Sequence, residues 1–400
     1  MNGKAVTLLV MGLLASHAVA ASWRINGFVN QAAISTTDNY FFGNTDDQVS
    51  FDYRELALIG AVALTDSVDV AGQVLSRKAG VASDGTPALD YGFVSWRFFE
   101  TYSVTQGLRL GRFKAPIGFY NDTRESPFTR NGIFLPQSIY LDRGRNYMMR
   151  ADELMYFGEW RAEEWTLNWK LAGGKSIPDK KELVDVFHLP DSVHPRLKSA
   201  NAWHFQLLSE YDGGRIRLGF STYRTPNNYS LDLDFVHLGH VDAEAVSLWR
   251  IYSFEYNAAA WSFTTEYEQA EFNYNGSSPD PANPNYKDYP EAGYAQLLWH
   301  VTPSSDLFVR REFMYFNKND PDGSYNATLL GAVVTGTTAL DRYGFSSMLG
   351  WVFRPAQDWL IRAELYHNRG DVWVTQRDAP DHFKLVKDWN MAAVAVSWRF

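Results

Sequence analysis

The chain has 400 residues, no cysteine and a formal net charge of -9, with 46% hydrophobic and 16% aromatic residues and a mean hydropathy of -0.30. Too many residues are apolar for a disordered chain. The acidic balance argues against a nucleic-acid binder, which needs a basic face for phosphates. The lack of cysteine excludes disulfides, thiolate zinc sites and cysteine nucleophiles.

Residues 1–20 have the three-part pattern of a secretory signal peptide. Lys4 provides a positive charge, residues 5–15 form a short and mostly apolar run, and the segment ends in Ala-Val-Ala, a small-residue cleavage site. We therefore expect cleavage after Ala20 and a single mature domain over residues 21–400, although a buried N-terminal helix is the alternative. No later stretch reaches the roughly 18 to 20 uninterrupted apolar residues of a membrane helix.

The rest of the chain alternates between apolar and polar residues. In the last segment, Ala392, Val394 and Val396 share one face with Trp398 and Phe400, and the residues between them take the other face. This period of two is typical of β-strands. The predicted strands lie near residues 23–33, 49–64, 68–78, 88–98, 104–114, 152–160, 164–174, 202–211, 214–224, 246–257, 260–274, 291–301, 306–317, 341–354, 358–368 and 388–400.

The connections alternate strictly in length, with seven short turns and eight long loops. This pattern predicts a 16-stranded antiparallel transmembrane β-barrel with short periplasmic turns and long outer loops. A soluble sandwich or propeller is the alternative, but neither requires such two-sided asymmetry. Tryptophans near strand ends would form belts at the membrane interfaces; they are Trp165, Trp203, Trp261, Trp359, Trp389 and Trp398.

Two local motifs resemble those of known outer-membrane proteins. The terminal Ser-Trp-Arg-Phe, which contains Trp398 and ends at Phe400, resembles the C-terminal strand that the barrel assembly machinery recognises. Residues 110–118, Leu-Gly-Arg-Phe-Lys-Ala-Pro-Ile-Gly, are similar to a stretch of the phosphate-selective porin (O/P) family. The resemblance implies a Gram-negative outer-membrane porin, a homotrimer, and a third loop that folds inward. Phosphate selectivity would require ladders of lysine and arginine, which are not evident here.

The longest connection, residues 115–151, is the third long loop and the expected constriction. The basic residues at its entrance and along it form a candidate anion-binding site, because charge acts strongly in a narrow and poorly screened passage. They are Lys114, Arg124, Arg130, Arg143, Arg145 and Arg150. Alternatively, some of these arginines only pair with Asp122, Glu125 and Asp142 and hold the loop against the wall.

Strand periodicity also predicts charged side chains on the inner wall. The predicted pore-lining residues are Lys170, Arg217, Glu266, Glu268, Arg342, Arg362 and Glu364. The mixture of signs would set a field across a water-filled lumen, which tolerates charge where a lipid face does not. Residues 306–317 give no clear periodicity. On the second strand, Ala57, Ala61 and Ala63 are candidates for a lipid-facing or intersubunit surface.

These observations predict a passive channel of the bacterial outer membrane that passes small hydrophilic solutes, with a mild preference for anions. We expect no enzymatic activity, cofactor, metal or nucleic-acid partner; the expected partners are solutes, outer-membrane lipid, the assembly machinery and two further copies. An enzyme barrel is one alternative, but no Gly-x-Ser-x-Gly or evident Ser/His/Asp grouping is present. An adhesive or structural barrel with a closed lumen is the other.

Overall fold

The protein forms a single β-sheet that closes on itself. The computed structural model describes residues 22–142, 145, 150–177, 196–232, 240–275, 286–325, 338–374, 378 and 384–400. The strands are β1 (Ser22–Thr36), β2 (Ser50–Ala63), β3 (Val68–Ala79), β4 (Ser83–Asp84), β5 (Ala88–Glu100), β6 (Val104–Lys114), β7 (Arg150–Arg161), β8 (Trp165–Ser176), β9 (Arg196–Lys198), β10 (Asn201–Tyr211), β11 (Ile216–Asp232), β12 (His240–Asn257), β13 (Trp261–Asn275), β14 (Lys287–Asp288), β15 (Glu291–Thr302), β16 (Ser305–Tyr315), β17 (Tyr343–Ala356), β18 (Trp359–Gly370) and β19 (Asp388–Arg399). Short 3-10 turns are η1 (Asn121–Thr123), η2 (Pro127–Thr129) and η5 (Ala339–Arg342).

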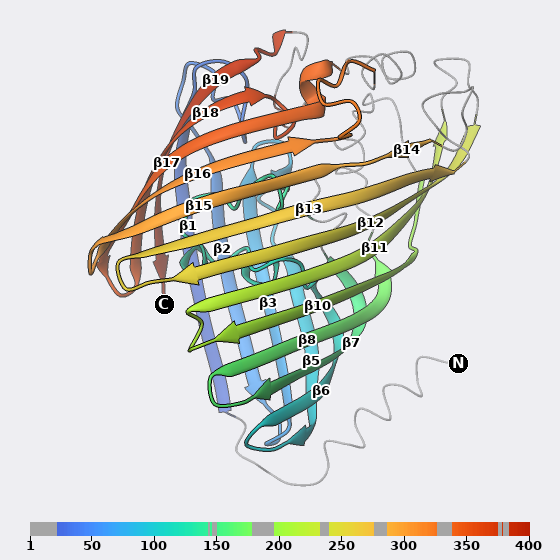
Figure 1. Ribbon diagram of the computed structural model, residues 1–400, viewed down its shortest axis with the longest axis vertical. Coiled ribbons are helices and arrows are strands. Elements are labelled where there is room, and N and C mark those ends of the chain that lie inside the picture. The colour runs from blue at the N-terminus through green and yellow to red at the C-terminus, as the bar shows by residue number, and fades with distance from the viewer. Residues whose placement is uncertain are drawn as a thin grey trace.

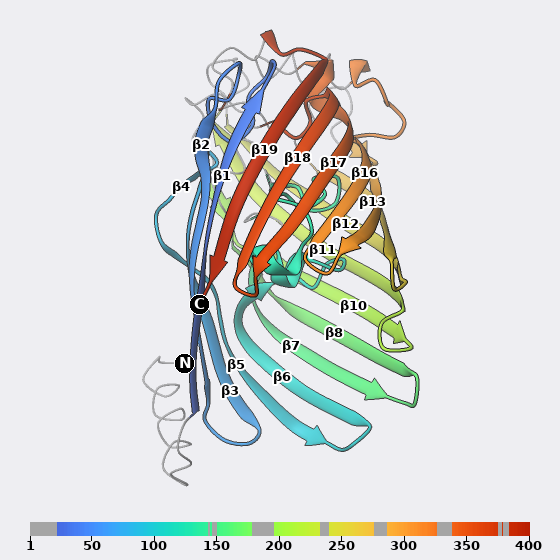
Figure 2. The same cartoon turned by 90° about the vertical axis from the view of Figure 1, so that its left-hand side faces the viewer.

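The sheet is a closed antiparallel barrel of sixteen long strands, as predicted. Each long strand pairs with the next one along the chain, and β1 pairs with β19 from Phe28↔Arg399 to Thr36↔Met391, which closes the ring. The two- and three-residue strands β4, β9 and β14 only extend the edges of β3, β11 and β13. Figures 1 and 2 show the strongly tilted strands around the lumen. Among the described residues, no helix is long and apolar enough to cross a membrane.

Short turns lie at one end of the barrel, called the turn end, and the long connections lie at the other, called the loop end. The seven predicted turns are all present, each two to four residues long between the strands. The turn between β10 and β11 uses left-handed backbone at Asp212, Gly213 and Gly214, with φ of 51°, 64° and 90°. Glycine adopts such angles without a steric penalty, which explains its place there.

Side chains alternate between the two faces of the wall. On β19, Met391, Ala393 and Ala395 are buried inside, whereas Val394 and Val396 are exposed outside. Exposed tryptophans near the turn end form one belt; they are Trp23, Trp96, Trp160, Trp165, Trp261, Trp299, Trp351, Trp359 and Trp398. The prediction that Trp389 belongs to an interface belt is wrong, because this residue is only 1% exposed and donates a hydrogen bond to the Gly370 carbonyl.

One assignment of inner and outer faces and two predicted strand boundaries are wrong. Ala57 lies on the inner face, because it packs with the buried Phe28 and Leu75 and shares the parity of the buried Glu55. The same parity places Ala61 and Ala63 inside. Arg342 does not belong to a strand, since η5 ends there and β17 starts at Tyr343. The third long loop also ends two residues earlier than predicted, because β7 starts at Arg150.

Candidate pore constriction

The third long loop leaves β6 at Lys114 and enters the barrel. The motif at residues 110–118 shapes this departure, because Gly111 and Gly118 have positive φ, 144° and 53°. A Cβ at Gly111 would lie 2.3 Å from the Gly92 carbonyl oxygen, so only glycine fits there. The Gly118 amide donates to Ser221 Oγ at 3.0 Å, and Gln206 donates to the Gly118 carbonyl at 2.7 Å. The loop therefore reaches the wall at β10 and β11, three and four strands along the barrel from β6, and runs through the interior (Figure 2).

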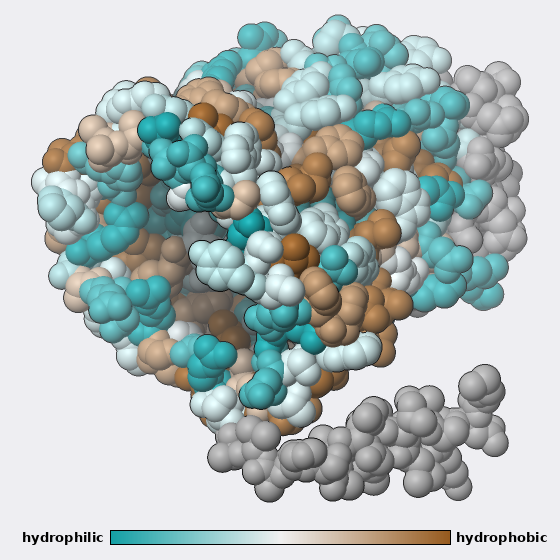
Figure 3. Space-filling model, turned by 60° about the horizontal axis from the view of Figure 1, so that its bottom comes forward, coloured by the Kyte–Doolittle hydropathy of each residue, from teal (hydrophilic) through white to brown (hydrophobic). Residues whose placement is uncertain are grey.

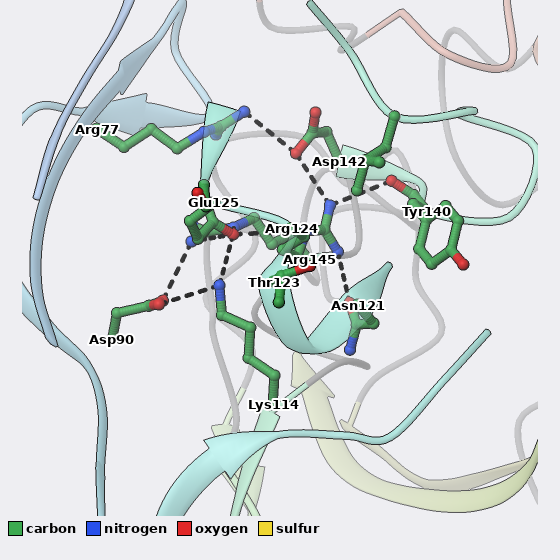
Figure 4. Close-up of polar contacts among 12 residues, drawn as sticks. Arg77, Asp90, Lys114, Asn121, Thr123, Arg124, Glu125, Tyr140, Asp142 and Arg145 are labelled. Carbon is green, nitrogen blue, oxygen red and sulfur yellow. Dashed lines mark hydrogen bonds and ion pairs between the residues drawn. The ribbon is translucent and has the colours of Figure 1, made fainter. Parts of the chain in front are cut away.

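On the side of β2, β3 and β5, a buried network of ion pairs holds the loop. We call this network the charged anchor; it comprises Glu55, Arg77, Asp90, Lys114, Arg124, Glu125, Arg130, Asp142 and Arg145. Three of these residues belong to wall strands, one ends β6, and five belong to the loop. Figure 4 shows how the loop residues and the wall residues converge.

Glu125 is at the centre of the charged anchor. Its Oε1 lies 2.7 Å from Lys114 Nζ and 2.8 Å from Arg145 Nη2. The same two cations contact Asp90 on β5, at 3.0 Å and 3.2 Å. Burial alone would raise the pKa of Glu125, but the charges of Arg145, Lys114 and Arg124 hold this pKa well below its ordinary range. Glu125 is therefore ionised at neutral pH.

A second part of the charged anchor joins the two ends of the loop to the wall. Asp142 Oδ1 accepts ion pairs from Arg77 on β3 at 3.1 Å and from Arg124 at 3.2 Å. Arg124 also donates to the Tyr140 carbonyl at 3.1 Å. Arg130 Nη2 pairs with Glu55 on β2 at 3.2 Å. The arginines are thus engaged with carboxylates, as the second interpretation of the loop expected.

On the side of β12, β13 and β15, the loop is held mainly by one carboxylate, while Tyr120 Oη donates a longer hydrogen bond, 3.4 Å, to Glu255. We call the main contact the Glu266 anchor. Glu266 accepts hydrogen bonds from the Phe119 amide at 2.9 Å, Tyr140 Oη at 2.7 Å and Tyr294 Oη at 2.9 Å. Ser253 Oγ donates the fourth at 2.7 Å. All four donors are neutral, so this anchor relies on hydrogen bonds to a single charge.

The tip of the loop contacts a third part of the wall. Arg362 on β18 donates to the Gly132 carbonyl at 2.5 Å, and Glu364 accepts from the Ile133 amide at 2.5 Å. On β16, Glu312 accepts from the amide of Ser138 at 3.1 Å and pairs with Arg310 at 2.8 Å. These contacts place Arg362 and Glu364 on the inner wall, where the periodicity predicted them.

The other predicted pore residues have different surroundings. Lys170 pairs with Asp122 of the loop. Arg217 pairs with Glu210 at 3.0 Å and Glu255 at 2.9 Å. Glu268 is buried on β13, on the same face as Glu266.

Three predicted cations are placed away from the described pore wall or cannot be assessed. Arg342 is buried at the loop end, with its guanidinium 4.9 Å from the Phe316 ring centroid. Arg143 lies outside the described residues, and for Arg150 only the backbone, at the start of β7, is described.

Sequence reasoning missed several charged residues of the lumen, among them Glu55, Arg77, Asp90 and Arg109. Period-two alternation within the predicted strands could have placed them inside, but not beside the loop. Arg109 lines a cavity of about 320 Å³ together with Tyr91, Phe93 and Asp122. Its guanidinium lies 4.2 Å from the Phe93 ring centroid, and its buried Nε has no hydrogen-bond partner among the described residues.

Viewed from the turn end, the molecule is hollowed, and both polar and apolar residues surround the opening (Figure 3). The described residues contain no group of three or more histidine, aspartate or glutamate side chains arranged to hold a metal ion. The described contacts present fixed charges and hydrogen-bonding groups around the loop.

Comparisons with known proteins concern the fold. No protein-family model and no curated protein sequence matches the chain. The outer membrane channel DcaP of Acinetobacter baumannii matches with a TM-score of 0.59 and 11% identity, over 96% of this chain and 99% of that one. An anion-selective porin from Comamonas acidovorans matches with a TM-score of 0.55 and 11% identity, over 95% and 100%. The trimer form of OmpT, an outer membrane protein of Vibrio cholerae, has a TM-score of 0.56 and 10% identity, over 96% and 100%. The chain therefore has the fold of outer-membrane porins.

Proposed function

We propose that the protein is a porin of the bacterial outer membrane, through which small hydrophilic solutes and ions diffuse passively. The observation that carries this proposal is the third long loop, which lies inside a closed barrel and is tied to its wall by the charged anchor and the Glu266 anchor. A loop held in this way narrows a passage permanently. Selection then depends on the width of the passage and on fixed charge, without covalent chemistry.

A mild preference for anions is supported by the balance of charge within the charged anchor. The charged anchor has five cations (Arg77, Lys114, Arg124, Arg130 and Arg145) and four carboxylates (Glu55, Asp90, Glu125 and Asp142), an excess of one positive charge. We infer that the loop arginines act mainly by fixing the loop and through this net potential. Arg109, which is stacked on an aromatic ring beside the cavity, adds a cation that is available to a passing anion.

Membrane localisation and assembly belong to the same proposal. We expect removal of residues 1–20, contact of the outer face with outer-membrane lipid, and recognition of Trp398 and Phe400 by the assembly machinery. Backbone hydrogen bonds in both directions between Phe400 and Gly27, each 3.0 Å long, give this end of the chain a role in closing the barrel. A homotrimer is supported by the porin fold, and membership of the phosphate-selective family by the motif at residues 110–118 alone.

The test is the reversal potential of the purified protein in a planar bilayer under a salt gradient. We expect open channels with an anion preference that Arg109→Gln reduces. The matched control is Arg250→Gln, which removes an arginine from the outer face of β12, between the buried inner residues Trp249 and Ile251. Replacing Arg124 or Arg130 would be a poorer test, because both hold the loop in place.

Each outcome has a separate meaning. Lack of conductance would overturn the porin and favour a closed barrel with an adhesive or enzymatic role. Cation preference, or an equal response to Arg109→Gln and Arg250→Gln, would retain the channel and overturn the proposed basis of its selectivity.

A further inference from the structure

Four polar side chains form a row across the outer face of the barrel. Arg311 on β16 is opposite Ser347 on β17, Ser347 is opposite His367 on β18, and His367 is opposite Asn390 on β19. Directly opposed residues of neighbouring strands share a face. The sequence neighbours of all four are buried inside, so this polar row faces outward.

The polar row lies close to the loop end, at the edge of the apolar outer surface. On the same outer face, Phe313 and Phe345 lie two positions nearer the loop end than Arg311 and Ser347. Leu349 and Leu365 lie two positions nearer the turn end than Ser347 and His367. Aromatic side chains in such positions mark the level of lipid headgroups. A charge on a lipid face is costly at the bilayer midplane and much less costly near the interface, so an arginine is tolerated at this level.

Arg311 has no carboxylate beside it on the neighbouring strands. Its cross-strand partners are Ala295 and Ser347, both uncharged. The guanidinium donates to Ser347 Oγ, and its carbon lies 5.9 Å from the Phe345 ring centroid, on the loop side. Arg250, another outward arginine, differs because it lies within electrostatic reach of Glu271. The charge of Arg311 is therefore directed toward the headgroup level with no carboxylate directly opposite it; on β15, Glu291 is opposite Tyr315, four residues nearer the loop end.

Below the polar row, toward the turn end, the outer surface has a shallow hollow. Its volume is about 600 Å³, and Arg311, Ser347 and His367 form its upper edge. The outward side chains of the rest are apolar; they are Phe263, Ala295, Leu297, Val309, Leu349 and Leu365. The inward-facing residues Gln296, Arg310, Met348 and Tyr366 complete the lining. The small Ala295 side chain leaves room between its larger neighbours. An apolar hollow that ends at a cation matches the two parts of a lipid.

We propose that the polar row and the hollow bind a phosphate-bearing lipid of the leaflet at the loop end. Its phosphate contacts Arg311, whose planar set of donors suits that group, and one acyl chain lies in the hollow. Basic groups at this level are known to bind anionic headgroups. A second copy of the chain would be the other occupant, but an arginine with no carboxylate directly opposite it favours phosphate. This inference rests on the proposed membrane location, not on the ion selectivity.

Native mass spectrometry of the full-length mature protein in detergent tests the site, with dimyristoyl phosphatidic acid as the probe and dimyristoylglycerol as the lipid without phosphate. We expect phosphatidic acid to bind, and Arg311→Gln to weaken it about tenfold, equivalent to about 1.4 kcal/mol. Ala295→Trp, which fills the hollow and leaves the charge, should also weaken binding. Arg250→Gln is the matched control and should retain it.

The proposal fails if Arg311→Gln binds phosphatidic acid as the unchanged protein does, or if Arg250→Gln loses as much affinity. It also fails if Arg311→Gln breaks up an oligomer without changing lipid occupancy, since the polar row would then be a contact between copies. Ion conductance is measured on the same preparations. Because these variants alter only the outer face, unchanged conductance with lost lipid separates this inference from the porin proposal.

Discussion

The charged anchor and the Glu266 anchor hold the same loop by different chemistry. In the charged anchor, wall and loop contribute groups of both signs, and each carboxylate has at least one cationic partner. In the Glu266 anchor, neutral amide and hydroxyl groups donate to one buried carboxylate. Removal of one member of a buried ion network leaves an uncompensated charge, whereas neutral donors can form new hydrogen bonds. The two sides should therefore differ in their sensitivity to substitution.

The largest expected effect is that of Glu125→Gln. The change leaves Lys114, Arg124 and Arg145 with too little negative charge in a buried site. We expect a loss of about 3–5 kcal/mol in the free energy of unfolding, measured by denaturant titration with tryptophan fluorescence. The control is Asp152→Asn, which disrupts the half-exposed pair with Arg112 and should cost about 0–1 kcal/mol. Equal costs for the two variants would show that burial of the charged anchor is unimportant.

The same comparison has a defined pH dependence. The folded-state pKa of Glu125 is below its ordinary value of 4.5, so its contribution to stability is present above that pH and is lost as pH falls through the folded pKa. The difference in unfolding free energy between the unchanged protein and Glu125→Gln should be constant from about pH 8 to pH 5 and should shrink in stronger acid. A difference that already shrinks between pH 7 and pH 6 would contradict this assignment.

Gly118→Ala should disturb the Glu266 anchor at intermediate cost. Gly118 has a φ of 53°, and a Cβ there would lie 2.2 Å from Tyr140 Oη and 2.6 Å from Glu266 Oε1. The left-handed backbone alone costs about 1–2 kcal/mol for alanine, and displacement of Tyr140 adds to it. We expect a total of about 2–3 kcal/mol and larger single-channel conductance, because the loop would move. The control is Gly213→Ala. Gly213 has a φ of 64°, and a Cβ there would have no neighbouring atom within 4 Å, so this variant measures the cost of the left-handed backbone alone.

The smallest expected effect is that of Tyr140→Phe, which removes one of the four donors to Glu266 and preserves the ring. We expect the free energy of unfolding to fall by about 1–2 kcal/mol, because one hydrogen bond to the Glu266 carboxylate is lost and the remaining neutral donors can rearrange around it. The measurement is the same denaturant titration. A loss as large as that of Glu125→Gln would remove the distinction between the two anchors.

The strands could be predicted because their signal is local. Alternation of period two recurs in sixteen segments. Short and long connections separate these segments in turn, and this pattern indicates a barrel. The errors arose where local parity is weak. Ala57 is small enough to suit either face, and Arg342 ends a 3-10 turn that immediately precedes β17. The site was predictable only as a basic loop: neither Arg77 nor Asp90 could be connected with it from sequence.

The sequence by itself determined the all-β class, the number of strands, the two-sided arrangement of connections and the concentration of arginine in the third long loop. The tertiary structure alone decided what those arginines contact. Glu55 and Arg130 are 75 residues apart in the chain, and Ile133 and Glu364 are 231 apart. Periodicity specifies the face of each side chain, but contacts across a lumen depend on strand register, barrel closure and the path of the loop, which are properties of the whole fold.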